Sequence, residues 1–233
     1  MSRPMTDLAG VSDATQRLIA GAAALRPEAV GEPSLLPGWT RGHVLAHLAR
    51  NADALVNVCS GLPMYPSAEA RDADIERDAG RPLQAHLADL RESAGRLSAA
   101  WDRLTGEQWA ATVELRNGVT DRASSVPLRR WVEVELHHID LGADRSVADL
   151  PGAFTDRAVD YFARRFAGHP GVPALELRAE DGRRWRTGDP AGEPLVVAGT
   201  PAALTGWLAG RTTGTGLTAG GAPGAALPVL PPL

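Results

Sequence analysis

Apolar residues recur every three to four positions in four long stretches of the first part of the chain, which is the spacing of one helix face. The pattern predicts amphipathic helices over residues 6–26, 40–60, 82–105 and 125–142. Thr40 is placed to cap the second of them. A polar segment at 69–78 predicts a short extra helix, and the turn signal Asn117-Gly118 predicts a loop or short hairpin within 109–125. Four main helices of this kind predict a bundle whose interior hosts a site.

The composition changes after Pro151. Helices are predicted over residues 154–166 and 201–208, and strands over 174–179, 184–187 and 195–198. Glu180-Asp181-Gly182 is a hairpin signal between the first two strands, and the Gly-, Pro- and Ala-rich tail from Gly214 predicts a loose end. The predicted fold is therefore mainly α with an α+β C-terminal part, divided into a four-helix bundle (1–150) and a small α+β domain (151–233).

The charge pattern narrows the function classes. All 24 basic residues are arginine, so a Schiff-base lysine and a phosphate-loop lysine are excluded. The formal net charge is −4, which argues against a nucleic-acid surface. We therefore expect a small-molecule partner and no nucleic acid.

The single cysteine, Cys59, excludes an intramolecular disulfide framework and a cysteine-based zinc cluster. The N-terminal residues lack the apolar core of a signal peptide, and no stretch approaches the roughly 20 apolar residues of a membrane span. We expect a cytoplasmic protein without a membrane partner, either a monomer or a homodimer.

Candidate metal ligands lie on the second and fourth predicted helices. Glu133 and His137 are four residues apart, so a helix places them on one face, and the apolar residues around them make an unpaired buried carboxylate costly. His43 and His47 share that spacing, and geometry alone does not choose between them, although His47 lies deeper in its helix. A carboxylate and two imidazoles supply three corners of a tetrahedral divalent-metal site and leave the fourth open.

Two further polar residues lie close to these ligands in sequence. Asp140 follows His137 by three residues and could orient its imidazole or simply bond to backbone. Asn51 follows His47 by one turn and could face the site, where a substrate-binding role and a structural hydrogen bond are equally plausible.

The segments 36–53 (LPGWTRGHVLAHLARNAD) and 129–142 (RRWVEVELHHIDLG) closely resemble the mycothiol-dependent maleylpyruvate isomerases of the DinB-like metalloenzyme superfamily. The resemblance spans nearly the whole chain and implies a DinB-like four-helix domain followed by a small α+β domain. It implies zinc, or another divalent metal, held by His47, Glu133 and His137. It also implies mycothiol, a sugar-linked cysteine thiol, as cosubstrate, and an important arginine in the C-terminal domain, which we assign to Arg211.

The implied reaction is thiol-dependent cis–trans isomerisation of maleylpyruvate to fumarylpyruvate. Its substrate carries two carboxylates, which a planar guanidinium matches, so Arg211 is the first candidate to bind it and Arg71 the second. The alternative for Arg71 is an exposed charge in the acidic segment 69–78. Two other functions stay open: a mycothiol S-transferase acting on another electrophile, and a non-catalytic protein that binds a small ligand.

Overall fold

The computed structural model describes residues 3–143, 145–223 and 226–232. Contacts divide the chain into two compact units, Met1–Arg145 and Ser146–Leu233, which are considered separately. Among the described residues, no helix combines the length and the apolar character needed to cross a membrane.

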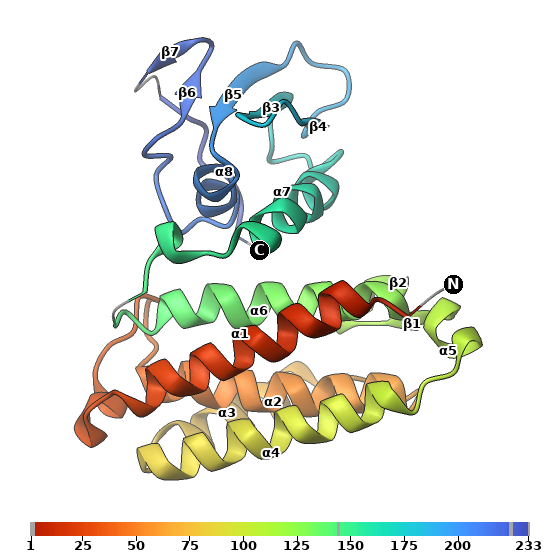
Figure 1. The fold of residues 1–233 in the computed structure, drawn as a ribbon, viewed down its shortest axis with the longest axis vertical. Helices are drawn as coiled ribbons and strands as arrows, with labels where there is room; N and C mark the ends of the chain where they lie inside the picture. The colour runs from red at the N-terminus through yellow and green to blue at the C-terminus, as the bar shows by residue number, and fades with distance from the viewer. Residues whose placement is uncertain (1–2, 144, 224–225, 233) are drawn as a thin grey trace. The chain divides into compact units, whose positions relative to one another are not determined.

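The first unit is a bundle of four long helices with a fifth packed on its side (Figure 1). The long helices are α1 (Met5–Ala23), α2 (Arg41–Cys59), α4 (Leu83–Asp102) and α6 (Val126–Asp140), and the additional helix is α3 (Ala68–Ala79). Helix α2 packs against α3, α4 and α6, while α1 packs against α4 and α6. The four predicted long helices and the short polar one are therefore all present.

Local sequence sets the helix ends. The Thr40 hydroxyl accepts a hydrogen bond from the His43 backbone N–H at 3.4 Å, which confirms the predicted cap of α2. Ser67 caps α3 in the same way. Pro127 lies in the first turn of α6, where its missing N–H costs nothing.

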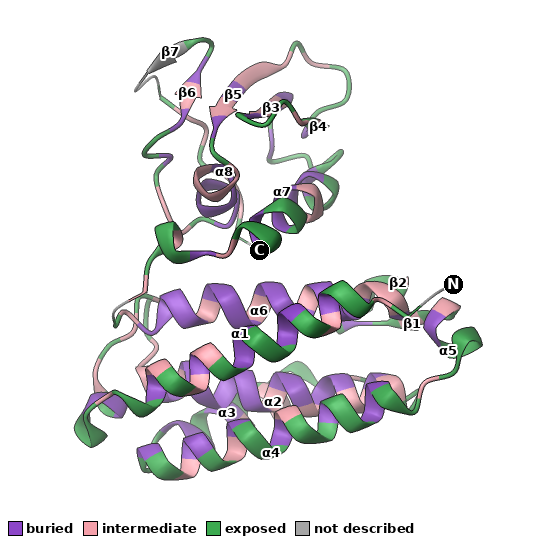
Figure 2. Ribbon diagram, in the orientation of Figure 1, coloured by how far each residue is buried: buried purple, intermediate pink, exposed green. Residues whose placement is uncertain are grey.

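The bundle is held together by buried apolar side chains, and the buried positions lie along its helices in Figure 2. Leu18, Leu45, Leu90 and Val134 are at most 1% exposed and come from four different helices. Each buried side chain of this size contributes about 1.5–3 kcal/mol relative to an exposed one. This burial fixes α2 and α6 side by side, so that side chains of the two helices can meet.

The connection between α4 and α6 holds short elements: α5 (Gly106–Ala110), β1 (Thr112–Glu114), β2 (Thr120–Arg122) and the 3-10 turns η2 (Arg116–Gly118) and η3 (Ala123–Ser125). Strands β1 and β2 pair antiparallel. Asn117 and Gly118 turn between them with φ values of 60° and 70°, a left-handed backbone that asparagine and glycine accept most readily. Of the two predictions for this segment, the short hairpin is the one the structure has.

The second unit is a five-stranded sheet with two helices. Its elements are η4 (Val147–Asp149), α7 (Gly152–Phe166), β3 (Leu175–Ala179), β4 (Arg184–Thr187), β5 (Leu195–Gly199), α8 (Pro201–Leu208), β6 (Thr218–Ala219) and β7 (Ala222–Pro223). The strand order is β4-β3-β5-β6-β7; β3 and β5 are parallel and the other neighbours antiparallel. The mainly α fold with a small α+β C-terminal part is thus confirmed.

The start of the tail departs from the prediction. No strand was predicted after Gly214, but β6 and β7 add two short strands to the sheet, and the described residues 226–232 that follow have no regular secondary structure. Gly220 and Gly221, with φ values of 57° and 83°, form the tight turn between them. Glycine therefore makes a hairpin here rather than an irregular end.

Candidate metal centre

Three potential ligands from two helices meet inside the first unit. The His47 Nε2 atom of α2 lies 3.0 Å from the Glu133 Oε2 atom of α6, and the His137 Nε2 atom lies 3.4 Å from the same oxygen. Each residue offers one donor atom, and these three atoms all lie within 4.8 Å of one another. The rings of His47 and His137 meet edge to face, with centroids 4.7 Å apart.

The helices explain why these residues meet. Glu133 and His137 are one turn apart on α6, and the packing of α2 against α6 brings His47 to them. His43 does not join this cluster: its Nδ1 atom accepts the Thr40 backbone N–H at 3.2 Å, and its Nε2 atom lies 3.0 Å from Glu76. The structure thus places His47 in the cluster, a choice that helix geometry left open and that the family resemblance made.

The pKa values in the cluster depend on one another, since Glu133 shifts those of both histidines and both histidines shift that of Glu133. Burial lowers the pKa of His47 to about 4, against the opposing effect of its hydrogen bond to Glu133. Burial alone would raise the pKa of Glu133, but hydrogen bonds with His137 and His47 outweigh it and hold that pKa well below the usual value. Burial would lower the pKa of His137, but Asp140 and Glu133 raise it instead. Glu133 is therefore ionised and His47 neutral at neutral pH.

Asp140 orients His137. Its Oδ2 atom lies 2.8 Å from the His137 Nδ1 atom, and its side chain is 2% exposed. In a neutral His137 whose proton is on Nδ1, the Nδ1–H group donates a hydrogen bond to Asp140, and the Nε2 lone pair points at the Glu133 carboxylate. The Nε2 lone pair and the carboxylate then face each other, and a cation between them relieves their repulsion.

A divalent metal ion fits this arrangement. Two neutral imidazoles and one carboxylate form a common donor set of catalytic zinc sites, with a fourth position left for a reactant. The Glu133 side chain is 37% exposed whereas that of His47 is 7% exposed, so the cluster is reached from solvent on the Glu133 side. Glu133 is less buried than the other glutamate of the helix: Glu135 is 1% exposed, lies on another face of α6 and pairs with arginines.

Arg71 borders the cluster. One of its guanidinium nitrogens lies 3.3 Å from the His47 Nδ1 atom, its Cζ atom lies 5.9 Å from the centre of the Tyr65 ring, and its side chain is only 11% exposed. The alternative of an exposed helix charge is therefore wrong. The Trp39 ring also lies next to the cluster, with its centroid 5.6 Å from that of the His47 ring.

Asn51 and Arg130 lie together beneath the cluster. Arg130 is 2% exposed and donates to the Asn51 Oδ1 atom at 2.7 Å and to the Leu48 carbonyl at 2.9 Å, tying α6 to α2. Burial lowers the pKa of Arg130 to about 10, so it stays charged at neutral pH. Sequence analysis missed Arg130, although a charge among the apolar residues of this helix, three positions before Glu133, was the available signal.

Arg211 belongs to the second unit. It follows α8, and one of its guanidinium nitrogens donates to the Ala209 carbonyl at 2.7 Å. Gly210, with a φ of 70°, ends the helix just before it and turns the chain.

Comparison with known proteins adds a family assignment to this geometry. A family model described as the mycothiol maleylpyruvate isomerase N-terminal domain matches residues 11–142, and one described as the MDMPI C-terminal domain matches residues 149–228. Similar solved structures include a mycothiol-dependent maleylpyruvate isomerase, at 28% identity, and a histidine-to-alanine mutant of such an enzyme, at 27% identity. Each match covers 100% of both chains with a TM-score of 0.87. No match was found among curated proteins.

Proposed function

Because the chain belongs to the mycothiol maleylpyruvate isomerase family, we propose that it is a mycothiol-dependent enzyme that isomerises maleylpyruvate to fumarylpyruvate. The observation that carries this proposal is the convergence of His47, Glu133 and His137 in the unit that matches the family's N-terminal domain. The partners are then two small molecules, an unsaturated diacid and a thiol. A reducing cytoplasm suits a free thiol of this kind.

His47, Glu133 and His137 would hold the metal, for which zinc is the proposed ion. When bound, zinc supplies a Lewis-acid position that lowers the pKa of a thiol. Asp140 keeps the His137 Nε2 lone pair directed at the site by accepting a hydrogen bond from the Nδ1–H group. Arg130 and Asn51 hold the two helices, and hence the three donors, at a fixed separation.

The reaction needs a nucleophile and a way to hold two carboxylates. The thiolate of the cosubstrate adds to one carbon of the cis double bond while an electron pair moves toward the conjugated carbonyl. The former double bond is now a single carbon–carbon bond, about which the molecule rotates. Elimination of the thiolate then restores the double bond and gives the trans product. Since the chain's own Cys59 is not among the residues of the cluster, the thiol comes from outside.

Arginines bind the substrate carboxylates in this proposal. Arg71 is the candidate in the first unit because its guanidinium borders the cluster, and Arg211 is the candidate in the second. Among the described residues the Asn51 amide nitrogen has no hydrogen-bond acceptor, so Asn51 also offers a donor to substrate while its oxygen is held by Arg130.

The test is an assay of purified protein with zinc, mycothiol and maleylpyruvate, followed by NMR detection of fumarylpyruvate. His47→Ala removes one proposed ligand and should lower the rate at least about 100-fold. His43→Ala, one turn earlier on the same helix, is the matched control and should retain most of the activity. If His47→Ala isomerises maleylpyruvate like the unmodified protein, the proposed centre is wrong. If mycothiol is consumed with a model electrophile while maleylpyruvate is unchanged, the protein is an S-transferase instead.

A further inference from the structure

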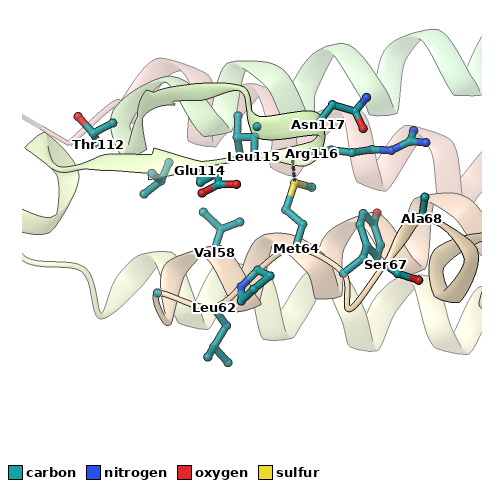
Figure 3. A pocket seen from close by; sticks show the side chains of 15 residues that line it. Val58, Leu62, Met64, Ser67, Ala68, Thr112, Glu114, Leu115, Arg116 and Asn117 are labelled. Atoms are coloured by element: carbon teal, nitrogen blue, oxygen red, sulfur yellow. Dashed lines mark hydrogen bonds between the residues drawn. The ribbon is translucent and has the colours of Figure 1, made fainter.

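A pocket of about 450 Å³ opens in the first unit between the α2–α3 connection and the β1–β2 hairpin (Figure 3). One wall is formed by residues between 58 and 68 and the other by residues 112–118. The Arg116 backbone N–H, 3.1 Å from the Met64 sulfur, joins the two walls. The volume lies within the range of small-molecule sites.

Tyr65 connects this pocket to the candidate metal centre. Its side chain lines the pocket, and its ring lies 5.9 Å from the Arg71 Cζ atom. Arg71 in turn lies 3.3 Å from His47. Burial raises the pKa of the Tyr65 hydroxyl, so this group stays protonated and able to donate a hydrogen bond. Only two side chains therefore separate the pocket from a proposed ligand.

The pocket holds fewer charged side chains than the metal centre. The pocket lining has one carboxylate, Glu114, and one guanidinium, Arg116, so its charged side chains sum to zero. Within the described parts of the chain, neither of these side chains forms an ion pair. The cluster instead concentrates charged groups of both signs, since the guanidinium groups of Arg71 and Arg130 lie near the carboxylates of Glu133 and Asp140. A lining without net charge suits an uncharged polar ligand, whereas the concentrated charges of the cluster suit a charged one.

The lining also suits a sugar. Ser67, Thr112 and Asn117 bring hydroxyl and amide groups, which exchange hydrogen bonds with ligand hydroxyls. Val58, Leu62 and Met64, on the same wall as Ser67, add an apolar surface on which the C–H face of a ring packs. Figure 3 shows Glu114 and Leu115 on the hairpin facing Val58 and Met64 across the pocket.

We propose that this pocket binds the sugar part of the thiol cosubstrate, whose cysteine end then passes Tyr65 to reach the cluster of His47, Glu133 and His137. The inference rests on the proposed function, because that function supplies a thiol joined to a neutral polyhydroxylated group. The diacid substrate and the sugar thereby occupy different places in the first unit. Affinity for the two reactants should respond to different substitutions.

A double substitution tests the pocket without touching the cluster. Arg116→Ala removes an exposed guanidinium, and Asn117→Gly removes the amide while the left-handed backbone (φ 60°) is one that glycine adopts readily. Arg91→Ala, an exposed arginine on α4 outside the pocket, is the charge-matched control. Thermal unfolding of each variant checks that the first unit is intact.

The probe is the S-methyl derivative of mycothiol, which keeps the sugar but lacks a thiol to coordinate metal. Isothermal titration of metal-free protein should give a Kd about tenfold weaker for the double variant than for the unmodified protein and the Arg91→Ala control. In the zinc-loaded protein, affinity for free cysteine should be unchanged in all three. Equal affinity of the double variant and the control for the probe, or no binding of the probe to the unmodified protein, would overturn the proposal. If the probe binds as expected but maleylpyruvate is not isomerised, the proposed electrophile fails and the pocket assignment stands.

Discussion

Helix α6 carries two glutamates, Glu133 and Glu135, whose surroundings differ in almost every respect. Glu133 is 37% exposed, and its hydrogen-bond partners are two imidazoles. Glu135 is 1% exposed, lies 2.7 Å from Arg17 and 2.6 Å from Arg145, and also accepts the indole N–H of Trp131 at 3.2 Å. Two residues along a helix rotate a side chain by about 200°, so one helix serves a site on one face and a structural ion cluster on the other.

The difference shows how a helix separates binding from stability. Permanent guanidinium charges neutralise Glu135, so its carboxylate has no unpaired charge that a ligand could bind. The imidazole partners of Glu133 carry a charge only when protonated, so its negative charge is available to an incoming cation. Replacing each carboxylate by its isosteric amide separates the two roles.

The largest effect is expected for zinc affinity in Glu133→Gln. The amide is neutral and a poor ligand, so affinity should fall at least about 100-fold, beyond the 10–100-fold typical of losing an outer hydrogen-bond partner. The unfolding free energy of the metal-free protein should change by less than about 1 kcal/mol, because the side chain is partly exposed. Zinc titration against a competing chelator, together with urea unfolding, measures both quantities. Zinc binding as tight as in the unmodified protein would remove Glu133 from the ligand set.

Glu135→Gln should show the reverse. It leaves Arg145, which is 11% exposed, and the more accessible Arg17 without their carboxylate. Removing one partner of a buried ion pair costs about 3–5 kcal/mol, and the lower end applies here because Arg17 is 38% exposed and turns to solvent. Urea unfolding of the first unit gives the loss, while zinc affinity of the folded protein should stay within about twofold. A stable variant with impaired zinc binding would contradict the separation of roles.

Much of the fold follows from the sequence alone. Helical periodicity and capping residues predicted all four long helices, because amphipathic stretches of this length bury one face in nearly any bundle. The hairpin whose turn contains Glu180-Asp181-Gly182 was likewise predictable from turn chemistry, and β3 and β4 do pair antiparallel. The two short strands near the end were not predicted, since β6 joins the sheet by pairing with β5, a contact across some 20 residues that no local pattern encodes.

The candidate site was harder to predict. Glu133 and His137 are paired by helix geometry, but the choice of His47 over His43 depends on how α2 packs against α6. Arg71 lies in an acidic segment typical of a solvated face, and only the position of α3 against α2 brings it to His47. Local sequence thus gives the chemistry of each helix, whereas tertiary packing decides which side chains meet.

Asp121 of β2 is partly exposed like Glu133 but pairs with an arginine like Glu135. Replacing it should have the smallest effect of the three carboxylate substitutions. It is 29% exposed and pairs with Arg129 of α6 at 2.8 Å. Burial would raise its pKa, but hydrogen bonds from Arg129 and the Arg122 backbone outweigh burial and lower it. The ionised form is thus favoured in the folded state. Its contribution is present above the ordinary carboxyl pKa of about 4 and is lost as pH falls through the lowered folded pKa.

Asp121→Asn should therefore destabilise the protein by about 0.5–1 kcal/mol at pH 7, as expected for a partly exposed pair. The deficit should shrink as pH falls below about 4, because the unmodified protein then loses the same interaction. Urea unfolding of both proteins at pH 7 and at pH 3 measures the two differences. A deficit as large as that of Glu135→Gln, or one that does not change with pH, would mean that exposure does not separate these carboxylates. The stability attributed to Glu135 would then need a cause other than its burial.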